Sequence, residues 1–343
     1  MIRTCALGIA ALVGMVALQL GLARAATPPA TPTSAAQTQS KPLAAKQPAP
    51  SQAAVLSANT IVHRDLAYGK NGKQRLDVYA PRALAQGDRH IFFGRPALGR
   101  EMAKGAEKNE PVPGLPVVIF VHGGEWARHD KAEVSYKPKF LNDNRIVFVS
   151  INYRLSPAAV HPAHVSDVAA AVRWVHDHAA EFGASANKIV LMGHSAGCHL
   201  VTLVALDPRY LARVGLRPAD LRGVVAWSGG AYDLVEKVRA GGMYAPYIRQ
   251  AFGNSKAAWR DASPVTHVGD AHPLPRFLFI SVERGNASYI ATQRLVELIR
   301  HAKGQADSRV LEGRTHFTAN HLLGAPGDTT GAILLDFVRQ VTR

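Results

Sequence analysis

The sequence predicts an α/β fold in which a mostly parallel central sheet carries helices on both faces. Several short apolar runs lack polar alternation, which is typical of strands that are buried on both sides. Helical periodicity appears between these runs, and strand and helix patterns alternate along the chain. Parallel neighbours need crossover connections, so this alternation favours a parallel sheet over an antiparallel one.

Composition excludes two classes of protein. The chain has 343 residues, 47% of them hydrophobic, with 40 Lys and Arg against 25 Asp and Glu for a formal net charge of +15. This apolar content can bury a core, which excludes disorder throughout the chain. Two cysteines allow one disulfide at most, which excludes a disulfide scaffold. The positive charge is compatible with nucleic acid, an anionic surface or simple solubility.

The first 25 residues have the pattern of a secretory signal peptide. Arg3 gives a positive start, the 17 residues Ala6–Leu22 are apolar and uncharged, and Ala23-Arg24-Ala25 fits a small-x-small cleavage site. The apolar stretch is short for a membrane span and contains three glycines. We therefore expect cleavage near Ala25 and export to the periplasm or the extracellular space, which leaves Cys198 as the single cysteine.

Residues 26–54 predict a disordered linker rich in Ala and Pro, and residues 55–343 predict the folded domain. Lys41 and Lys46 are the only charges in the linker, and such a composition buries too little surface to offset its ordering entropy. Four basic residues and no acidic residue precede position 51, so the rest of the chain holds 36 basic and 25 acidic residues, a net charge of +11. The folded part is basic in its own right.

The elements of the folded part follow in order. An early strand is expected at Leu76–Ala80, and the apolar runs predict further strands at Val117–Val121, Ile146–Ile151, Lys188–Met192, Gly223–Trp227 and Phe277–Val282. Helical stripes predict helices at His164–Phe182 and Tyr289–His301. Ser308–Glu312 predicts the last strand and Thr329–Val341 the last helix.

Two long segments interrupt this pattern. Residues 85–116 form an insertion rich in glycine, proline and charge, and residues 231–266 contain several aromatic side chains after the Gly223–Trp227 strand. Loops of this length are often functional. We expect the second segment to be a small lid or a surface elaboration.

The strongest local motif is Gly193-His194-Ser195-Ala196-Gly197. A G-x-S-x-G pattern is informative when a strand precedes it and a helix follows it, because the serine then stands on a sharp, strained turn. Here Lys188–Met192 predicts the strand, and Cys198–Leu206 predicts the helix. The N–H of Ala196 would lie at a helix N-terminus, where it can stabilise developing negative charge. Ser195 is therefore the predicted nucleophile.

A second motif supplies further donors for such a charge. His122-Gly123-Gly124-Glu125-Trp126 directly follows the Val117–Val121 strand. Consecutive glycines let backbone N–H groups approach an oxyanion without side-chain obstruction. Gly123, Gly124 and Ala196 are the predicted oxyanion hole, and Trp126 is expected to line the substrate pocket.

These motifs resemble the α/β-hydrolase fold and, within it, the HGG-type esterases and the kynurenine-formamidase-like enzymes. The resemblance runs from about Val62 to the C-terminus. Further shared features are Asn152–Pro157, the helix with Asp167 and Trp174, Ser228–Leu234, Ala262-Ser263-Pro264 and His316-Phe317. The fold alone names no substrate, because it hosts many chemistries.

The resemblance implies that the catalytic base lies between the last strand and the last helix. A serine hydroxyl needs such a base within hydrogen-bond reach, and the chain has 15 histidines to choose from. His316 lies in the implied segment, with His321 as its neighbour and competitor. His122 is expected to hold its own loop by hydrogen bonding instead of transferring protons.

The acid departs from the family pattern. The resemblance implies an aspartate after the penultimate strand, but Gly285 stands at that position. Glu283 is the only carboxylate of this loop and is the first choice, because glutamate can also orient an imidazole. Asp233 after the preceding strand is the second choice, and a weakened dyad completed by Asn286 or water is the third.

The resulting expectation is a serine hydrolase that cleaves carboxylic esters through an acyl-enzyme, with no metal or cofactor. The substrate would be a small ester or an ester carried by a polysaccharide. The kynurenine-formamidase resemblance leaves an N-formyl aryl amide as an alternative, and the missing aspartate leaves a non-catalytic binding protein. The sequence contains no basic run interleaved with aromatic residues, which is the pattern that would favour nucleic-acid binding. An anionic envelope is a possible electrostatic contact, and no obligate protein partner is evident.

Overall fold

The computed structural model describes residues 54–82, 114–271 and 273–343, which belong to one compact unit, Ala49–Arg343. The predicted signal peptide, all but the last residue of the predicted linker and residues 85–113 of the predicted insertion lie outside the described residues. The last residues of that insertion, Leu115 and Pro116, begin a strand of the sheet.

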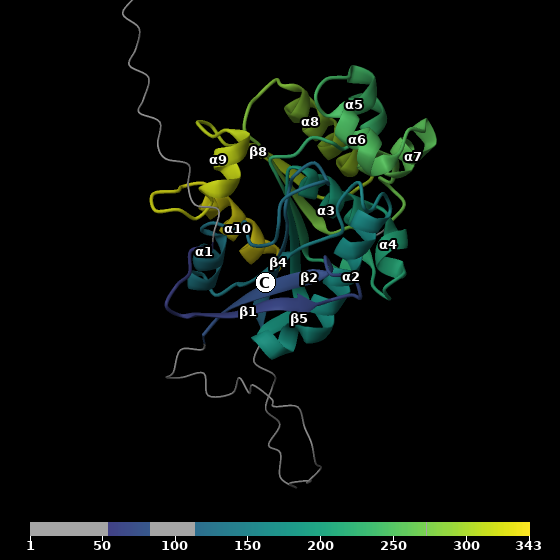
Figure 1. Ribbon diagram of the computed structural model, residues 1–343. Coiled ribbons are helices and arrows are strands. Elements are labelled where there is room, and N and C mark those ends of the chain that lie inside the picture. The colour runs from purple at the N-terminus through teal and green to yellow at the C-terminus, as the bar shows by residue number, and fades with distance from the viewer. Residues whose placement is uncertain (1–53, 83–113, 272) are drawn as a thin grey trace, which may run out of the picture. The chain divides into compact units, whose positions relative to one another are not determined.

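An eight-stranded sheet forms the centre of the described chain (Figure 1). Its strands lie in the order β1-β2-β4-β3-β5-β6-β7-β8, and only the β1/β2 and β2/β4 pairs are antiparallel. Their bounds are β1 Thr60–Ala67, β2 Arg75–Pro81, β3 Leu115–Val121, β4 Val147–Ile151, β5 Ala184–His194, β6 Gly223–Trp227, β7 Arg276–Ser281 and β8 Ala306–Val310. The predicted mostly parallel sheet is confirmed.

Each predicted strand has a counterpart, and β6 has the predicted bounds. The last strand begins and ends two residues earlier than predicted, because β8 pairs with β7 from Phe277 opposite Ala306 to Ser281 opposite Val310. When β7 ends at Ser281, the chain after Val310 has no strand to pair with. Leu311 makes one more backbone hydrogen bond, from its N–H to the Ser281 carbonyl, and the chain then leaves the sheet.

The sheet divides the core into two apolar clusters, as the alternation of side chains along a strand requires. On β3, Val117, Ile119 and Val121 belong to one cluster, and Val118 and Phe120 belong to the other. The first cluster contains side chains of α2 Ala163–His178, α3 Ala196–Leu206 and α8 Ala287–His301. The second contains side chains of α1 Lys137–Asp143, α9 His316–His321 and α10 Gly331–Val341. In Figure 1, α1 and α10 lie on one side of the sheet and α2 and α3 on the other.

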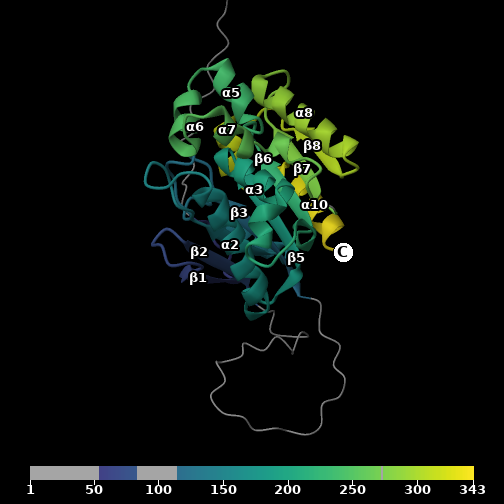
Figure 2. The same ribbon diagram turned by 90° about the vertical axis from the view of Figure 1, so that its right-hand side faces the viewer.

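The predicted lid segment contains three short helices, α5 Leu234–Ala240, α6 Ala245–Phe252 and α7 Lys256–Asp261. Together with α8 they lie at one end of the molecule, at the top of Figures 1 and 2. α4 Pro208–Ala212 follows α3 and contributes Tyr210 and Leu211 to the first apolar cluster. A role of these helices as a lid stays a prediction.

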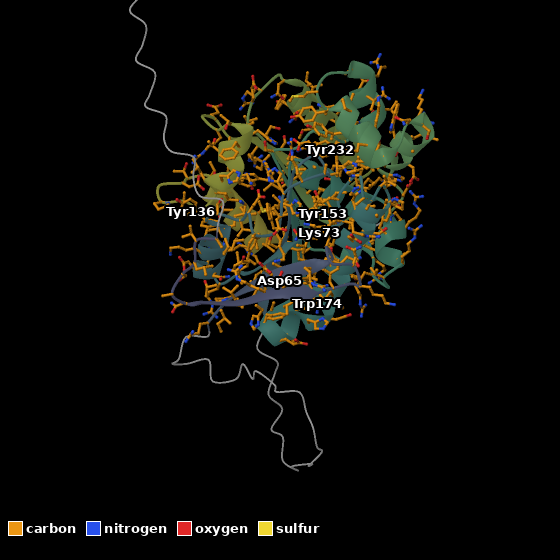
Figure 3. The ribbon with its side chains drawn as sticks, in the orientation of Figure 1. Asp65, Lys73, Tyr136, Tyr153, Trp174 and Tyr232 are labelled. Atoms are coloured by element: carbon orange, nitrogen blue, oxygen red, sulfur yellow. The ribbon has the colours of Figure 1, made fainter. Side chains whose placement is uncertain are left out.

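The antiparallel edge of the sheet carries a buried ion pair. Asp77 on β2 is fully buried, and its carboxylate accepts a 2.7 Å hydrogen bond from Nζ of Lys131. The same ammonium lies 2.8 Å from Asp65, whose position on β1 is labelled in Figure 3. Pairing offsets the cost of burying these charges. No helix within residues 54–343, as far as they are described, is long and apolar enough to span a membrane.

Candidate active site

Ser195 stands on a strained turn between β5 and α3. Its backbone has φ 55° and ψ −117°, a conformation that costs a non-glycine residue energy. The turn is also very tight: a Cβ on Gly193 would lie 2.3 Å from the Gly197 carbonyl oxygen, and one on Gly197 would lie 2.1 Å from the Val121 carbonyl oxygen. Only glycine fits at these positions, which is the physical reason for the G-x-S-x-G spacing. The predicted strand, turn and helix are confirmed.

The loop after β3 packs against this serine. A Cβ on Gly123 would lie 2.9 Å from the Cβ of Ser195, so this glycine permits a contact that any side chain would prevent. Gly124 has φ +94°, a conformation that favours glycine. Ala196 is the first residue of α3, so its N–H has no acceptor within the helix. The predicted oxyanion-hole residues thus border the nucleophile.

His122 holds this loop in shape. Its Nδ1–H donates a 2.8 Å hydrogen bond to the Gly123 carbonyl oxygen, and its ring stacks on Tyr153 with 4.5 Å between centroids. The Tyr153 hydroxyl, near the centre of the molecule in Figure 3, lies 3.2 Å from the carbonyl oxygens of both His122 and Gly123. Burial lowers the pKa of His122 to about 4, so the ring is neutral near pH 7. These contacts agree with the expected structural role.

A cavity of about 460 Å³ opens beside the serine. Ser195 and His316 both line it, and so does Trp126, whose side chain is otherwise buried against His199 and Phe252. The predicted lid contributes further lining residues, namely Ala231, Lys237, Tyr244 and Ile248. Two motifs and one distant histidine therefore meet at one concave site, where a small molecule would reach all of them.

His316 is the first residue of α9, and two hydrogen bonds tie this short helix to the sheet. Nε2–H of His194 donates to the His316 backbone carbonyl oxygen at 3.2 Å, and the two imidazole rings lie 4.6 Å apart. The indole N–H of Trp227 donates to the Ala319 carbonyl oxygen at 2.8 Å. His321, the competing base, is buried beside Ser135 instead and does not line the cavity.

The partner of the His316 ring is a serine. Oγ of Ser228 lies 2.8 Å from Nδ1 of His316. Ser228 directly follows β6, is 4% exposed and has φ +63°. Its N–H donates to the Ile280 carbonyl oxygen at 2.9 Å, which fixes the backbone of Ser228 to the neighbouring strand β7.

Neither predicted acid contacts this imidazole in the described part of the chain. Glu283 lines the cavity but is exposed, and its carboxylate accepts a 3.1 Å hydrogen bond from the Asn286 amide. Asp233 caps α5 by accepting from the Glu236 N–H at 3.0 Å, and it lies 3.6 Å from Arg294. The expectation that Glu283 or Asp233 orients His316 is therefore corrected: local partners hold both carboxylates, and Ser228 occupies the position at Nδ1.

Desolvation and the oxyanion loop both affect the pKa of His316. Loss of hydration against the cavity walls lowers the pKa of His316 from its usual value, and the carboxylate of Glu125 opposes this effect. Glu125 also lines the cavity, and it accepts a 2.7 Å hydrogen bond from Arg128. His316 is consequently neutral at pH 7, the state that a general base requires.

Sequence reasoning missed the roles of Ser228 and Glu125 in this site. Both belong to segments that the sequence singled out, and both follow strands whose carboxyl ends meet at the same edge of the sheet. That position was a usable signal for Ser228. The family pattern points to Glu283 or Asp233, or to Asn286 or water, as the partner of the base, and none of these is the Ser228 hydroxyl at the same edge.

Within the described residues, no group of three or more His, Cys, Asp or Glu side chains is arranged to hold a metal ion. Cys198 is a buried free thiol whose Sγ–H lies 3.1 Å from the Gly193 carbonyl oxygen, and burial raises its pKa. Its side chain belongs to the first apolar cluster.

Comparison with known proteins agrees with this geometry. The chain is 29% identical over 218 residues to the esterase LipQ of Mycobacterium tuberculosis, covering 61% of this chain and 46% of LipQ. It is 31% identical over 249 residues to the esterase LipC of the same organism, covering 69% of this chain and 61% of LipC. The chain spans about half the length of the curated relatives it matches first.

Solved structures share the fold. Esterase B from Lactobacillus rhamnosis matches with a TM-score of 0.63 at 17% identity, over 84% of this chain and 88% of that chain. The model of the BD-FAE family matches residues 106–284, which span the oxyanion loop, the nucleophile turn and the segment that holds Ser228. This match covers more than half of the sequence, and the chain therefore belongs to the BD-FAE family, on an α/β-hydrolase fold.

Proposed function

We propose that this protein is a serine hydrolase that cleaves carboxylic esters through an acyl-enzyme on Ser195. One observation carries the proposal: a strained serine, Glu125 and Trp126 of the glycine loop that packs against it, and a neutral histidine line the same cavity. Strain at a serine turn has no packing benefit, and it is what exposes a nucleophile. The similarity to proteins named as esterases supports the same reading.

The geometry suggests a sequence of steps. Ser195 Oγ attacks the ester carbonyl carbon while Nε2 of His316 takes its proton. The N–H groups of Gly123, Gly124 and Ala196 stabilise the oxyanion of the tetrahedral intermediate. His316 then gives the proton to the leaving alcohol, and a water molecule, activated by the same imidazole, releases the acid and restores Ser195.

The size and setting of the site bear on the substrate. A cavity of about 460 Å³ fits a short acyl group with a small alkyl or aryl alcohol, or the ester-bearing end of a longer chain. The pattern of the first 25 residues supports export to the periplasm or the extracellular space. Net positive charge would favour an acidic polymer or an anionic envelope as the surroundings of this substrate.

The test compares wild type with Ser195→Ala on p-nitrophenyl acetate. Wild type should turn the ester over, and the variant should lose at least about 10⁴-fold in kcat, because no other group can form the acyl-enzyme. Ser150→Ala is the matched control, since this buried hydroxyl lies on β4 away from the cavity. Equal rates for wild type and Ser195→Ala would overturn the proposal.

A second substrate distinguishes an esterase from an amidase. The kynurenine-formamidase resemblance makes N-formylkynurenine the informative competitor, and we expect p-nitrophenyl acetate to give the higher kcat/KM. A higher value on the formamide would replace the ester assignment with an amidase.

A further inference from the structure

The base of this site has an unusual partner. In the Ser-His-Asp arrangement a carboxylate accepts the Nδ1–H hydrogen bond of the catalytic histidine, which fixes the tautomer and stabilises the imidazolium. In this protein Nδ1 of His316 is hydrogen-bonded to Oγ of Ser228, at 2.8 Å. Both carboxylates that could replace it are held elsewhere, by Asn286 and by Arg294.

Ser228 is fixed where it stands. Its backbone is hydrogen-bonded to β7, and the two glycines that follow it lie in close contact with other elements. A Cβ on Gly229 would lie 2.4 Å from the Cβ of Cys198 on α3, and one on Gly230 would lie 2.6 Å from the Cβ of Ser288 on α8. The side chain is buried, so solvent does not compete strongly for its hydroxyl. The residue is therefore built into the site and is not a surface serine that happens to lie nearby.

The positions of the protons on His316 decide what its hydrogen bond with Ser228 can do. For Nε2 of His316 to accept the proton of Ser195, the ring must carry its own proton on Nδ1, and Ser228 Oγ then accepts the hydrogen bond. A hydroxyl differs from a carboxylate in two respects: it brings no negative charge, and it can also donate, so it orients the ring without enforcing the tautomer. The negative charge felt by His316 comes instead from Glu125, across the cavity.

We propose that Ser228 is the positioning residue of the base, so that the protein works through Ser195, His316 and Ser228 with none of the described carboxylates on the imidazole. The inference rests on the proposed function, because it assigns how the same histidine is held. On this proposal a neutral hydrogen bond orients His316. A carboxylate introduced at position 228 should make the same imidazole a stronger base.

The experiment measures kcat, KM and pH profiles for substitutions at one position. Ser228→Ala should lower kcat roughly 10-fold and change KM less, because the ring loses the hydrogen bond that orients it. Ser228→Asn should recover part of this loss, since its amide oxygen can accept from Nδ1 and asparagine tolerates positive φ. Thermal unfolding of each variant confirms that the fold is intact.

Ser228→Asp provides the readout that a purely structural role would not give. A carboxylate beside Nδ1 stabilises the imidazolium, so the acidic limb of kcat/KM should shift upward by about one pH unit relative to wild type. Its kcat should exceed that of Ser228→Ala. If the aspartate variant does not fold, the difference in kcat between Ser228→Ala and Ser228→Asn still tests whether Ser228 positions His316.

Two results would overturn the proposal. One is a Ser228→Ala variant whose kcat stays within twofold of wild type. The other is a loss of about 10⁴-fold in Glu283→Gln or Asp233→Asn, the size expected for a true triad acid. Failure of the proposed function is distinguishable from both, because wild type would then show no turnover that depends on Ser195.

Discussion

The two halves of this active site are built in different ways. The nucleophile half lies on buried central strands. A Cβ added at Gly193 or Gly197 would lie as close as 2.1 Å to a backbone oxygen, so only glycine fits at these positions beside Ser195. The base half lies on the short helix α9 beyond the last strand, where His316 is exposed to the cavity and is held by side-chain hydrogen bonds. Backbone geometry fixes the first half, and a few polar contacts orient the second.

This difference shows where the site tolerates change. A turn locked by backbone contacts allows almost no substitution, because the contacts belong to the sheet itself. A histidine held by hydrogen bonds can keep its function when one partner is replaced by another acceptor. The role proposed for Ser228 in place of a carboxylate belongs to this second half.

The largest effect is expected at the base. His316→Ala should lower kcat on p-nitrophenyl acetate by at least about 10³-fold, because Ser195 loses its proton acceptor. His321→Ala is the matched control, since His321 is buried beside Ser135 and does not line the cavity. Comparable losses of kcat in two folded variants would contradict the choice of His316.

A large effect on stability is expected in the nucleophile half. Gly197→Ala should lower the free energy of unfolding by about 3 kcal/mol or more, because its Cβ would lie 2.1 Å from a carbonyl oxygen of β3. Gly72→Ala is the control, since nothing lies within 4 Å of its Cβ. Urea unfolding measures both. A cost below about 1 kcal/mol for Gly197→Ala would show that the turn is not locked.

Buried histidines behind the nucleophile should make the fold sensitive to acid. Burial lowers the pKa of His122 to about 4 and that of His199 to about 3, below the value of about 6.5 expected in the unfolded chain. The unfolded state therefore binds more protons, and stability is complete above about pH 6.5 and falls as the pH drops toward 4. Each histidine contributes a slope of up to about 1.4 kcal/mol per pH unit.

Urea unfolding between pH 7 and 5 checks this slope. His199→Leu removes one titrating group, so its slope should be shallower by about 1 kcal/mol per pH unit on average over this range, although the variant is less stable at pH 7. A free energy of unfolding that does not change over this range would mean that these rings are protonated in the folded protein.

The smallest effect is expected at the carboxylate that the sequence favoured. Glu283→Gln should change kcat by no more than about threefold, because this exposed side chain contacts Asn286 and not the imidazole. Steady-state kinetics on p-nitrophenyl acetate suffices as the measurement. A loss approaching that of His316→Ala would restore Glu283 as the acid and remove the contrast between the two halves.

The sequence predicted the backbone-determined half of the site better than the other half. Apolar runs gave the parallel strands, and the glycine spacing around Ser195 and Gly123 gave the turn and the loop, because local sequence dictates local geometry there. The prediction at residues 308–312 was displaced by two positions, since strand ends depend on the partner strand.

The partner of His316 could not be predicted in the same way. Ser228 and His316 are 88 positions apart, and their contact depends on how β6 and α9 are placed in three dimensions. The family pattern led to carboxylates, and Glu283 is the only carboxylate in the loop after β7. Side-chain direction and competing hydrogen bonds, which only the structure supplies, decided against it.

Peptide-mapped labelling of the protein by a fluorophosphonate tests whether Ser195 is an activated nucleophile. An activated serine predicts a single adduct, on the peptide that carries Ser195, formed by folded wild type and abolished by denaturation or by His316→Ala. No adduct on the folded protein, or equal labelling after denaturation, would contradict the account and would make the chain a binding protein on a hydrolase fold.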